Sequence, residues 1–202
     1  MGVSDIVTSR CAGFFQKLVG HSDAVAQTAE SALGRDTLSL SAKSPTLENF
    51  RQVTPNLLRG GVPDEADLAW LAAHGVKTDV SLQNAFMGSE KPVVAAERQT
   101  AAKLGMNFVN LPLPYGKEPP QSMVDSWVKL LEDPNAGPIY VHCKQGRDRT
   151  GTMVAIERIL NEGYTGEQAL AEMKTFGFDP SHYPKYAEFV LALGKRVRQA
   201  SA

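Results

Sequence analysis

A strand-to-helix turn around residue 145 constrains this chain more than any other segment. An apolar run at residues 137–141 precedes the sequence HCKQGRDRTG at residues 142–151, and a helical pattern follows to Leu160. A short apolar run bounded by turn residues is typical of a buried strand. The turn therefore sets a thiol, Cys143, and a guanidinium, Arg149, at a helix N-terminus, where backbone N–H groups bind anions. We expect this turn to lie at the carboxyl end of a central strand, where open α/β sheets bind ligands.

The side chains of the turn suit covalent transfer of a phosphoryl group. A helix N-terminus and neighbouring cations (Lys144, Arg147 and Arg149) lower the pKa of a cysteine, which makes Cys143 the candidate nucleophile. The planar fork of Arg149 can grip two oxygens of one phosphate, which a lysine cannot do in the same way. The product of attack is a phosphocysteine, and we expect the hydroxyl of Thr150 to stabilise the departing sulfur when water cleaves it.

The backbone of the turn is expected to hold the phosphate itself. Successive N–H groups wrapped around an anion form a nest, and Gly146 permits a backbone angle closed to residues with side chains. His142 is expected to support the loop by hydrogen bonding to its carbonyl groups. The candidate phosphate-binding residues are Lys144, Gln145, Gly146, Arg147, Asp148 and Arg149.

Three segments together resemble a known family. The loop, with its complete HC…RTG pattern, resembles the signature loop of the cysteine-dependent protein tyrosine phosphatase superfamily. Residues 49–63 (NFRQVTPNLLRGGVP) resemble a segment near the start of such domains, and residues 111–120 (LPLPYGKEPP) fall where the family keeps a mobile acid loop. The resemblance spans residues 49 to about 195 and favours the compact dual-specificity branch, including tyrosine-phosphatase-like phytases. It implies a phosphoric monoester hydrolase.

Strand and helix patterns alternate from residue 50 onward. Strands are expected at residues 56–60, 77–82, 107–111 and 138–142, and helices at 64–71, 90–104, 122–132, 150–161, 165–176 and 185–197. Asp64 is expected to cap its helix, and the pairs Ser122–Asp125 and Thr165–Gln168 have the spacing of capping boxes. Such alternation predicts an α/β fold with a central, mostly parallel sheet flanked by helices.

Two parts are expected along the chain. Residues 1–48 form an N-terminal helical extension and linker, with apolar residues between Ile6 and Val19 at helical spacing. This helix is expected to pack on the domain, and docking on a membrane surface or a partner is the alternative. Residues 49–202 form the phosphatase-like catalytic domain. Cys11 is expected to be a buried residue rather than a redox partner of Cys143.

The proton donor for the leaving group is the least determined part of the predicted site. The resemblance implies an aspartate between residues 112 and 120, but that segment offers Tyr115, Lys117 and Glu118 instead. Asp148 is the first candidate, because some relatives carry an acid there, and Glu118 is the second. Asp125 comes third, since a capping carboxylate would face backbone N–H groups.

The expected substrate is a phosphate ester carrying several negative charges. Lys144 and Arg147 beside the loop, with Lys117 opposite, exceed what one phosphate needs, and the same placement resembles inositol phosphatases. An inositol polyphosphate or phosphoinositide is therefore favoured. A phosphotyrosine or dual-specificity protein phosphatase is the alternative, and a catalytically silent phosphate-binding module is the second alternative.

Composition narrows the partners. A net charge of −1 gives no basic field for nucleic acid, and two cysteines give no disulfide framework, so a reducing, cytoplasmic location is expected. Apolar runs are too short to cross a membrane, which leaves the N-terminal helix as the one candidate for membrane contact. No metal or cofactor is expected, because the histidines are scattered, and we expect a monomer. The four histidines are His21, His74, His142 and His182.

Overall fold

Residues 46–86 and 88–200 are described by the computed structural model. Five strands form one sheet in the order β1-β2-β5-β3-β4, in which β1 is antiparallel to β2 and the other neighbours are parallel. The strands are β1 (Arg51–Thr54), β2 (Leu57–Gly60), β3 (Thr78–Ser81), β4 (Asn107–Asn110) and β5 (Ile139–His142). The helices are α2 (Glu65–Ala73), α3 (Glu90–Lys103), α4 (Gln121–Glu132), α5 (Asp148–Asn161), α6 (Gly166–Thr175) and α7 (Pro184–Ala200). The mostly parallel sheet predicted from the sequence is confirmed.

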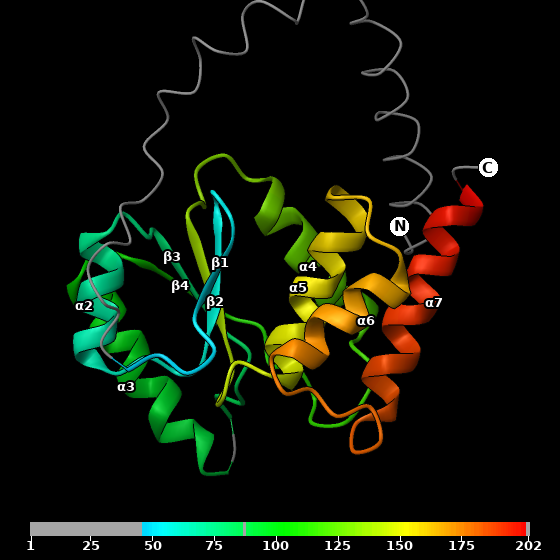
Figure 1. Cartoon of the computed structure of the whole chain (residues 1–202). Helices are drawn as coiled ribbons and strands as arrows, with labels where there is room; N and C mark the ends of the chain where they lie inside the picture. The colour runs from blue at the N-terminus through cyan, green and yellow to red at the C-terminus, as the bar shows by residue number, and fades with distance from the viewer. Residues whose placement is uncertain (1–45, 87, 201–202) are drawn as a thin grey trace, which may run out of the picture.

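Helices cover both faces of the sheet, with α2 and α3 on one side and α4 to α7 on the other (Figure 1). Neighbouring residues of one strand point to opposite faces, so Leu57 joins the larger apolar core with α4 to α7 and Leu58 joins the smaller core with α2 and α3. Val141 and Tyr140 of β5 divide in the same way. The central strand β5 is thereby buried on both faces, and its carboxyl end leads directly into the predicted loop.

One strand and the start of one helix differ from the sequence prediction in ways that matter for the site. Strand β1 was not predicted; it is an edge strand of four residues, mostly half-exposed, and lacks the apolar alternation that reveals a strand. Helix α5 begins at Asp148 rather than at Thr150, because the loop itself turns into the first helical residues. The phosphate-binding candidates therefore continue into the first turn of α5.

The predicted caps have mixed outcomes. Asp64 accepts a hydrogen bond from Asp67 N at the start of α2, and Thr165 forms a complete capping box with Gln168. The capping box predicted at Ser122 and Asp125 is wrong. Helix α4 already begins at residue 121, behind a proline with extended backbone, so Ser122 lies inside the first turn and Asp125 accepts from the Gln121 side chain instead.

The N-terminal predictions lie largely outside the described residues, which begin at Thr46. The predicted helix between Ile6 and Val19, and Cys11 with it, fall in that part of the chain. Thr46 donates to Asp67 at 3.1 Å and Glu48 accepts from Gly61 N at 2.7 Å, so the end of the predicted linker contacts the domain. Among the described helices, none has the length and apolar character needed to span a membrane.

The two predicted caps allow a matched test. Replacing Thr165 with alanine removes the acceptor for Gln168 N, and we expect the free energy of unfolding to fall by about 1 kcal/mol. Ser122→Ala is the control, because that side chain makes no cap hydrogen bond, and it should change stability by less than about 0.5 kcal/mol. Urea unfolding followed by circular dichroism measures both, and equal losses would contradict the assignment.

Candidate active site

The loop between β5 and α5 turns at Gly146. This glycine has φ of +69°, and a Cβ atom there would lie 2.5 Å from the carbonyl carbon of Gly60. The backbone angle is unfavourable for other residues, and the space is closed as well. The requirement for glycine expected from the sequence therefore has two separate causes at this position.

Three successive carbonyl groups of the loop accept hydrogen bonds from the segment around β2. The bonds run from Val62 N to Lys144 O at 3.2 Å, from Asn49 Nδ2 to Gln145 O at 2.8 Å, and from Arg59 Nη2 to Gly146 O at 2.6 Å. Because the N–H and C=O groups of a trans peptide point in opposite directions, holding these carbonyls on the back of the loop leaves the N–H groups for its inner side. The segment that resembles the start of phosphatase domains thus orients the predicted anion nest.

Arg59 is a fully buried cation behind the loop. Its guanidinium lies 3.8 Å from the centre of the Phe176 ring, and burial lowers its pKa to about 10. A group with that pKa keeps its charge at neutral pH. The bond to Gly146 O is therefore charge-assisted, and such bonds are stronger than neutral ones.

Cys143 lies at the floor of the loop with 4% of its surface exposed. Burial alone would raise the pKa of the thiol, but the Thr150 hydroxyl, the charge of Arg149 and the backbone N–H groups of Thr150 and Gln145 outweigh burial and lower it. The thiolate is the nucleophilic form of cysteine. The loop therefore favours the reactive state of this side chain.

Arg149 forms an ion pair with Glu90, the first residue of α3. Its Nη2 and Nη1 atoms lie 2.6 and 3.1 Å from the two carboxylate oxygens of Glu90, and Nη1 also donates to Leu82 O at 3.2 Å. Glu90 is itself fixed by the N–H of Asn84 at 2.8 Å. This two-point pair fixes the plane of the guanidinium beside Cys143.

A cleft of about 760 Å³ opens above Cys143. Of the residues predicted for the site, those lining it are Tyr115, Cys143, Lys144, Gln145, Asp148 and Arg149. Apolar and aromatic side chains also line it, among them Phe86, which is 74% exposed. The cleft therefore combines a polar floor with an apolar rim.

Other predicted residues lie behind or beside the cleft. His142 and Thr150 are fully buried behind the loop, and Arg147 turns toward Gln145 and packs its stem near Gly177. Lys117 and Glu118 are exposed, and neither contributes to the cleft lining.

Tyrosines of the last helix and the turn before it fix the loop opposite Cys143. Tyr186 donates to Pro114 O at 2.8 Å and accepts from Gly116 N at 3.1 Å, and the Tyr115 hydroxyl bonds to that of Tyr183. The Tyr115 ring in turn lies 5.6 Å from the guanidinium carbon of Arg149. The backbone and the Tyr115 side chain of this loop thus contact α7 and the turn before it, and the Tyr115 ring also contacts Arg149.

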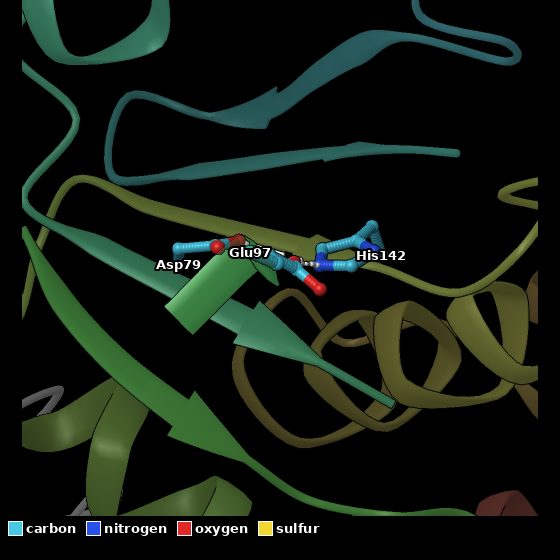
Figure 2. A group of neighbouring side chains, drawn as sticks. All are labelled: Asp79, Glu97 and His142. Carbon is cyan, nitrogen blue, oxygen red and sulfur yellow. Dashed lines mark ion pairs between the residues drawn. The ribbon is translucent and has the colours of Figure 1, made fainter. Parts of the chain in front are cut away.

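A buried ionic cluster lies on the α3 side of the sheet. His142 Nε2 lies 3.3 Å from Asp79 Oδ1 and also contacts Glu97 Oε1, and at most 4% of any of the three residues is exposed (Figure 2). Within the described residues, this is the group whose side chains could together approach a metal ion, with one ligand atom of each within 4.8 Å of the others. The His142 ring lies within ion-pairing distance of both carboxyl groups, and no spacing in the sequence indicated that the three residues would meet.

The sheet order and the loop with its bound arginine agree with the family match, which places the chain in the cysteine-dependent protein tyrosine phosphatase superfamily. Residues 39–188 match a family model described as "PTP-NADK: DSP-PTPase phosphatase fused to NAD+ Kinase", and the chain belongs to this family.

Individual relatives differ in what their names state. The chain is 29% identical over 150 residues to dual specificity protein phosphatase TpbA of Pseudomonas aeruginosa, which covers 74% of the chain and 64% of TpbA. It is 25% identical over 116 residues to inositol diphosphatase DSP1 of Oryza sativa, covering 55% and 50%. The chain thus spans less than two thirds of each relative. A crystal structure of a P. aeruginosa TpbA variant with phosphotyrosine superposes with a TM-score of 0.61 at 23% identity, over 76% of this chain and 90% of that one.

The glycine of the loop can be tested against a second glycine. Gly163 has φ of +72° but no atom within 4 Å of a built Cβ, whereas Gly146 has both a positive φ and a backbone clash. We expect Gly163→Ala to cost about 1 kcal/mol and Gly146→Ala on the order of 3 kcal/mol or more. Thermal and urea unfolding measure the difference. Equal costs would show that the loop can move away from Gly60.

Proposed function

We propose that this chain hydrolyses phosphate monoesters through a phosphocysteine intermediate. The observation that carries the proposal is the meeting of three groups in one cleft: the Cys143 thiol with its lowered pKa, the Arg149 guanidinium and the Asp148 carboxyl. A nucleophile, a binder of phosphate charge and a proton donor are what a phosphoryl transfer of this kind requires. The names of the relatives support phosphatase activity.

In the first half of the proposed reaction, the Cys143 sulfur attacks phosphorus as the bond to the leaving oxygen breaks. Arg149 and the loop N–H groups bind the other phosphate oxygens while charge redistributes over them. Asp148 gives its proton to the leaving oxygen. In the second half, water attacks phosphorus, Asp148 takes a proton from that water, and the Cys143 thiolate leaves with the Thr150 hydroxyl beside it.

Asp148 is the proton donor that the geometry supports. It lies in the first turn of α5 and lines the cleft, and burial raises the pKa of its carboxyl despite the charges of Arg147 and Arg149. A raised pKa keeps more of the acid protonated near neutral pH. Glu118, the second candidate, is exposed and lies outside the cleft lining.

For the substrate, we propose that phosphotyrosine in a protein fits the cleft better than a polyphosphorylated ring. The preference for inositol phosphates assumed that Lys144 and Arg147 both meet substrate, but Arg147 bonds to Gln145 and does not line the cleft. The apolar rim with Phe86 and Tyr115 suits an aromatic ring, since aromatic pairs favour offset or edge contacts. An inositol polyphosphate or phosphoinositide is the second candidate, supported by Lys144 in the cleft and by the name of a relative.

The experiment that tests the reaction measures phosphate release by the wild type and by Cys143→Ser. The substrates are para-nitrophenyl phosphate, a phosphotyrosine peptide, inositol hexakisphosphate and a phosphoinositide. We expect turnover by the wild type and none by the variant, with kcat/KM highest for the peptide. Turnover that survives in Cys143→Ser would exclude the mechanism. Binding of phosphate without turnover by the wild type would leave the phosphate-binding module as the function.

Asp148→Asn tests the proton donor. We expect kcat to fall by about 10² or more on an alkyl phosphate, whose leaving group needs a proton, and far less on para-nitrophenyl phosphate. The wild-type kcat should decline as pH rises through the pKa of Asp148, because only the protonated acid can donate. That decline should disappear in the variant.

Glu118→Gln is the matched control, since it removes a carboxyl from the neighbouring loop. It should leave the leaving-group dependence unchanged. A larger loss of kcat on the alkyl phosphate in Glu118→Gln than in Asp148→Asn would identify Glu118 as the proton donor instead.

A further inference from the structure

Helix α3 contacts the phosphate loop at two points through one face. Glu90 pairs with Arg149, and Glu97 contacts His142, the residue that precedes the nucleophile. The two glutamates are seven residues apart, which is nearly two full turns, so they lie on the same side of the helix. The partners are the last residue of β5 and an early residue of α5, so α3 braces both ends of the loop.

The environment of the His142 ring indicates its protonation state. The Nε2 atom faces the carboxylates of Asp79 and Glu97 (Figure 2), and the Nδ1 atom lies 3.4 Å from the carbonyl oxygen of Cys143. A backbone carbonyl can only accept a hydrogen bond, and ionised carboxylates can only accept as well. A neutral imidazole has a single N–H, whereas the imidazolium has one for each side.

Among the described residues, Glu97 and Asp79 are the groups whose carboxyl oxygens contact the His142 ring. Gly60 lies beside it on β2 and brings no side chain, and the Tyr140 ring stacks against it at 5.6 Å on its own strand. The ring is fully buried. A buried charge requires a paired partner, and Glu97 from α3 and Asp79 from β3 are the groups that supply it.

We propose that Glu97 is a positioning residue that holds His142 as an imidazolium, with Asp79 as a secondary contact, so that the His142 Nδ1–H fixes the Cys143 carbonyl at the back of the loop. The N–H group of the Cys143–Lys144 peptide then points toward the cleft. The hydrogen bonds to the next three carbonyl groups of the loop orient the N–H groups of those peptides in the same way. The consequence for turnover rests on the phosphatase function proposed above, whereas the protonation state of His142 is independent of that function.

The two carboxylates have unequal parts. Glu97 makes the closer contact with His142, and its charge is the main cause that raises the pKa of His142 against burial. Burial, together with the nearby Glu97, raises the pKa of Asp79, so a proton resides on Asp79 more readily than on an ordinary aspartate. We therefore assign the counter-ion to Glu97 and the secondary contact to Asp79.

The direct test is ¹⁵N NMR of the full chain with labelled histidine, with His142→Asn used to assign the signals. We expect both ring nitrogens of His142 to stay protonated from pH 6 to pH 8 in the wild type. In Glu97→Gln, one nitrogen should lose its proton within that range, and in Asp79→Asn it should not. A neutral His142 ring in the wild type at pH 7, or a stoichiometric divalent metal bound to the purified protein, would overturn the proposal.

A double-mutant cycle tests the consequence for the loop. An asparagine at position 142 offers an amide N–H to the Cys143 carbonyl without needing a counter-ion. We expect Glu97→Gln alone to lower kcat on para-nitrophenyl phosphate about tenfold, with little change in KM, as loss of one charge-assisted hydrogen bond predicts. In the His142→Asn background, the same change should alter kcat by less than about twofold.

Losses that simply add in the double variant would show a general structural role and overturn the proposal. Urea unfolding of each variant separates misfolding from a displaced loop, and the wild-type NMR result decides the protonation state if Glu97→Gln does not fold. Absence of turnover by the wild type would remove the proposed function while leaving that result standing.

Discussion

The carbonyl groups of the phosphate loop all need partners on one side for its N–H groups to face the other. The protein supplies those partners from segments distant in sequence: Asn49, Arg59 and Val62 from around β2. Without them the loop would have to bury unpaired carbonyls, each at a cost of about 1–3 kcal/mol. The lowered pKa of Cys143 and the placement of Arg149 follow from this arrangement, because both depend on where the loop backbone lies.

Features that depend on short segments, or on a pattern repeated along the chain, could be predicted from the sequence. Cys143, Arg149, the turn at Gly146 and the Thr165 cap lie within short segments, and the alternation of apolar runs predicted the sheet and its helices. Strand β1 was not predicted, because an exposed edge strand needs no apolar face. The Ser122 cap was wrong because Pro120 had already started the helix.

Contacts between distant segments could not be read in this way. Glu90 was predicted as the first residue of a helix and Asp79 as part of a strand, yet each contacts a residue at least 59 positions away. Charged residues that come together only in the folded chain have no characteristic spacing in the sequence. Arg147 shows the converse, since its position beside the loop suggested a phosphate contact, while the folded chain turns it toward Gln145 and Gly177.

The hydroxyl contacts of Tyr183 and Tyr186 connect one wall of the cleft to helix α7 and the turn before it. The position of α7 therefore affects the width of the cleft. Tyr183 lies just before α7, which packs on α6, and Tyr186 lies in the first turn of α7; their hydroxyl groups contact Pro114, Tyr115 and Gly116. Sequence change in the packing between the last two helices would shift the wall against which a substrate rests. Relatives could thus diverge in substrate choice while every residue of the loop stays the same.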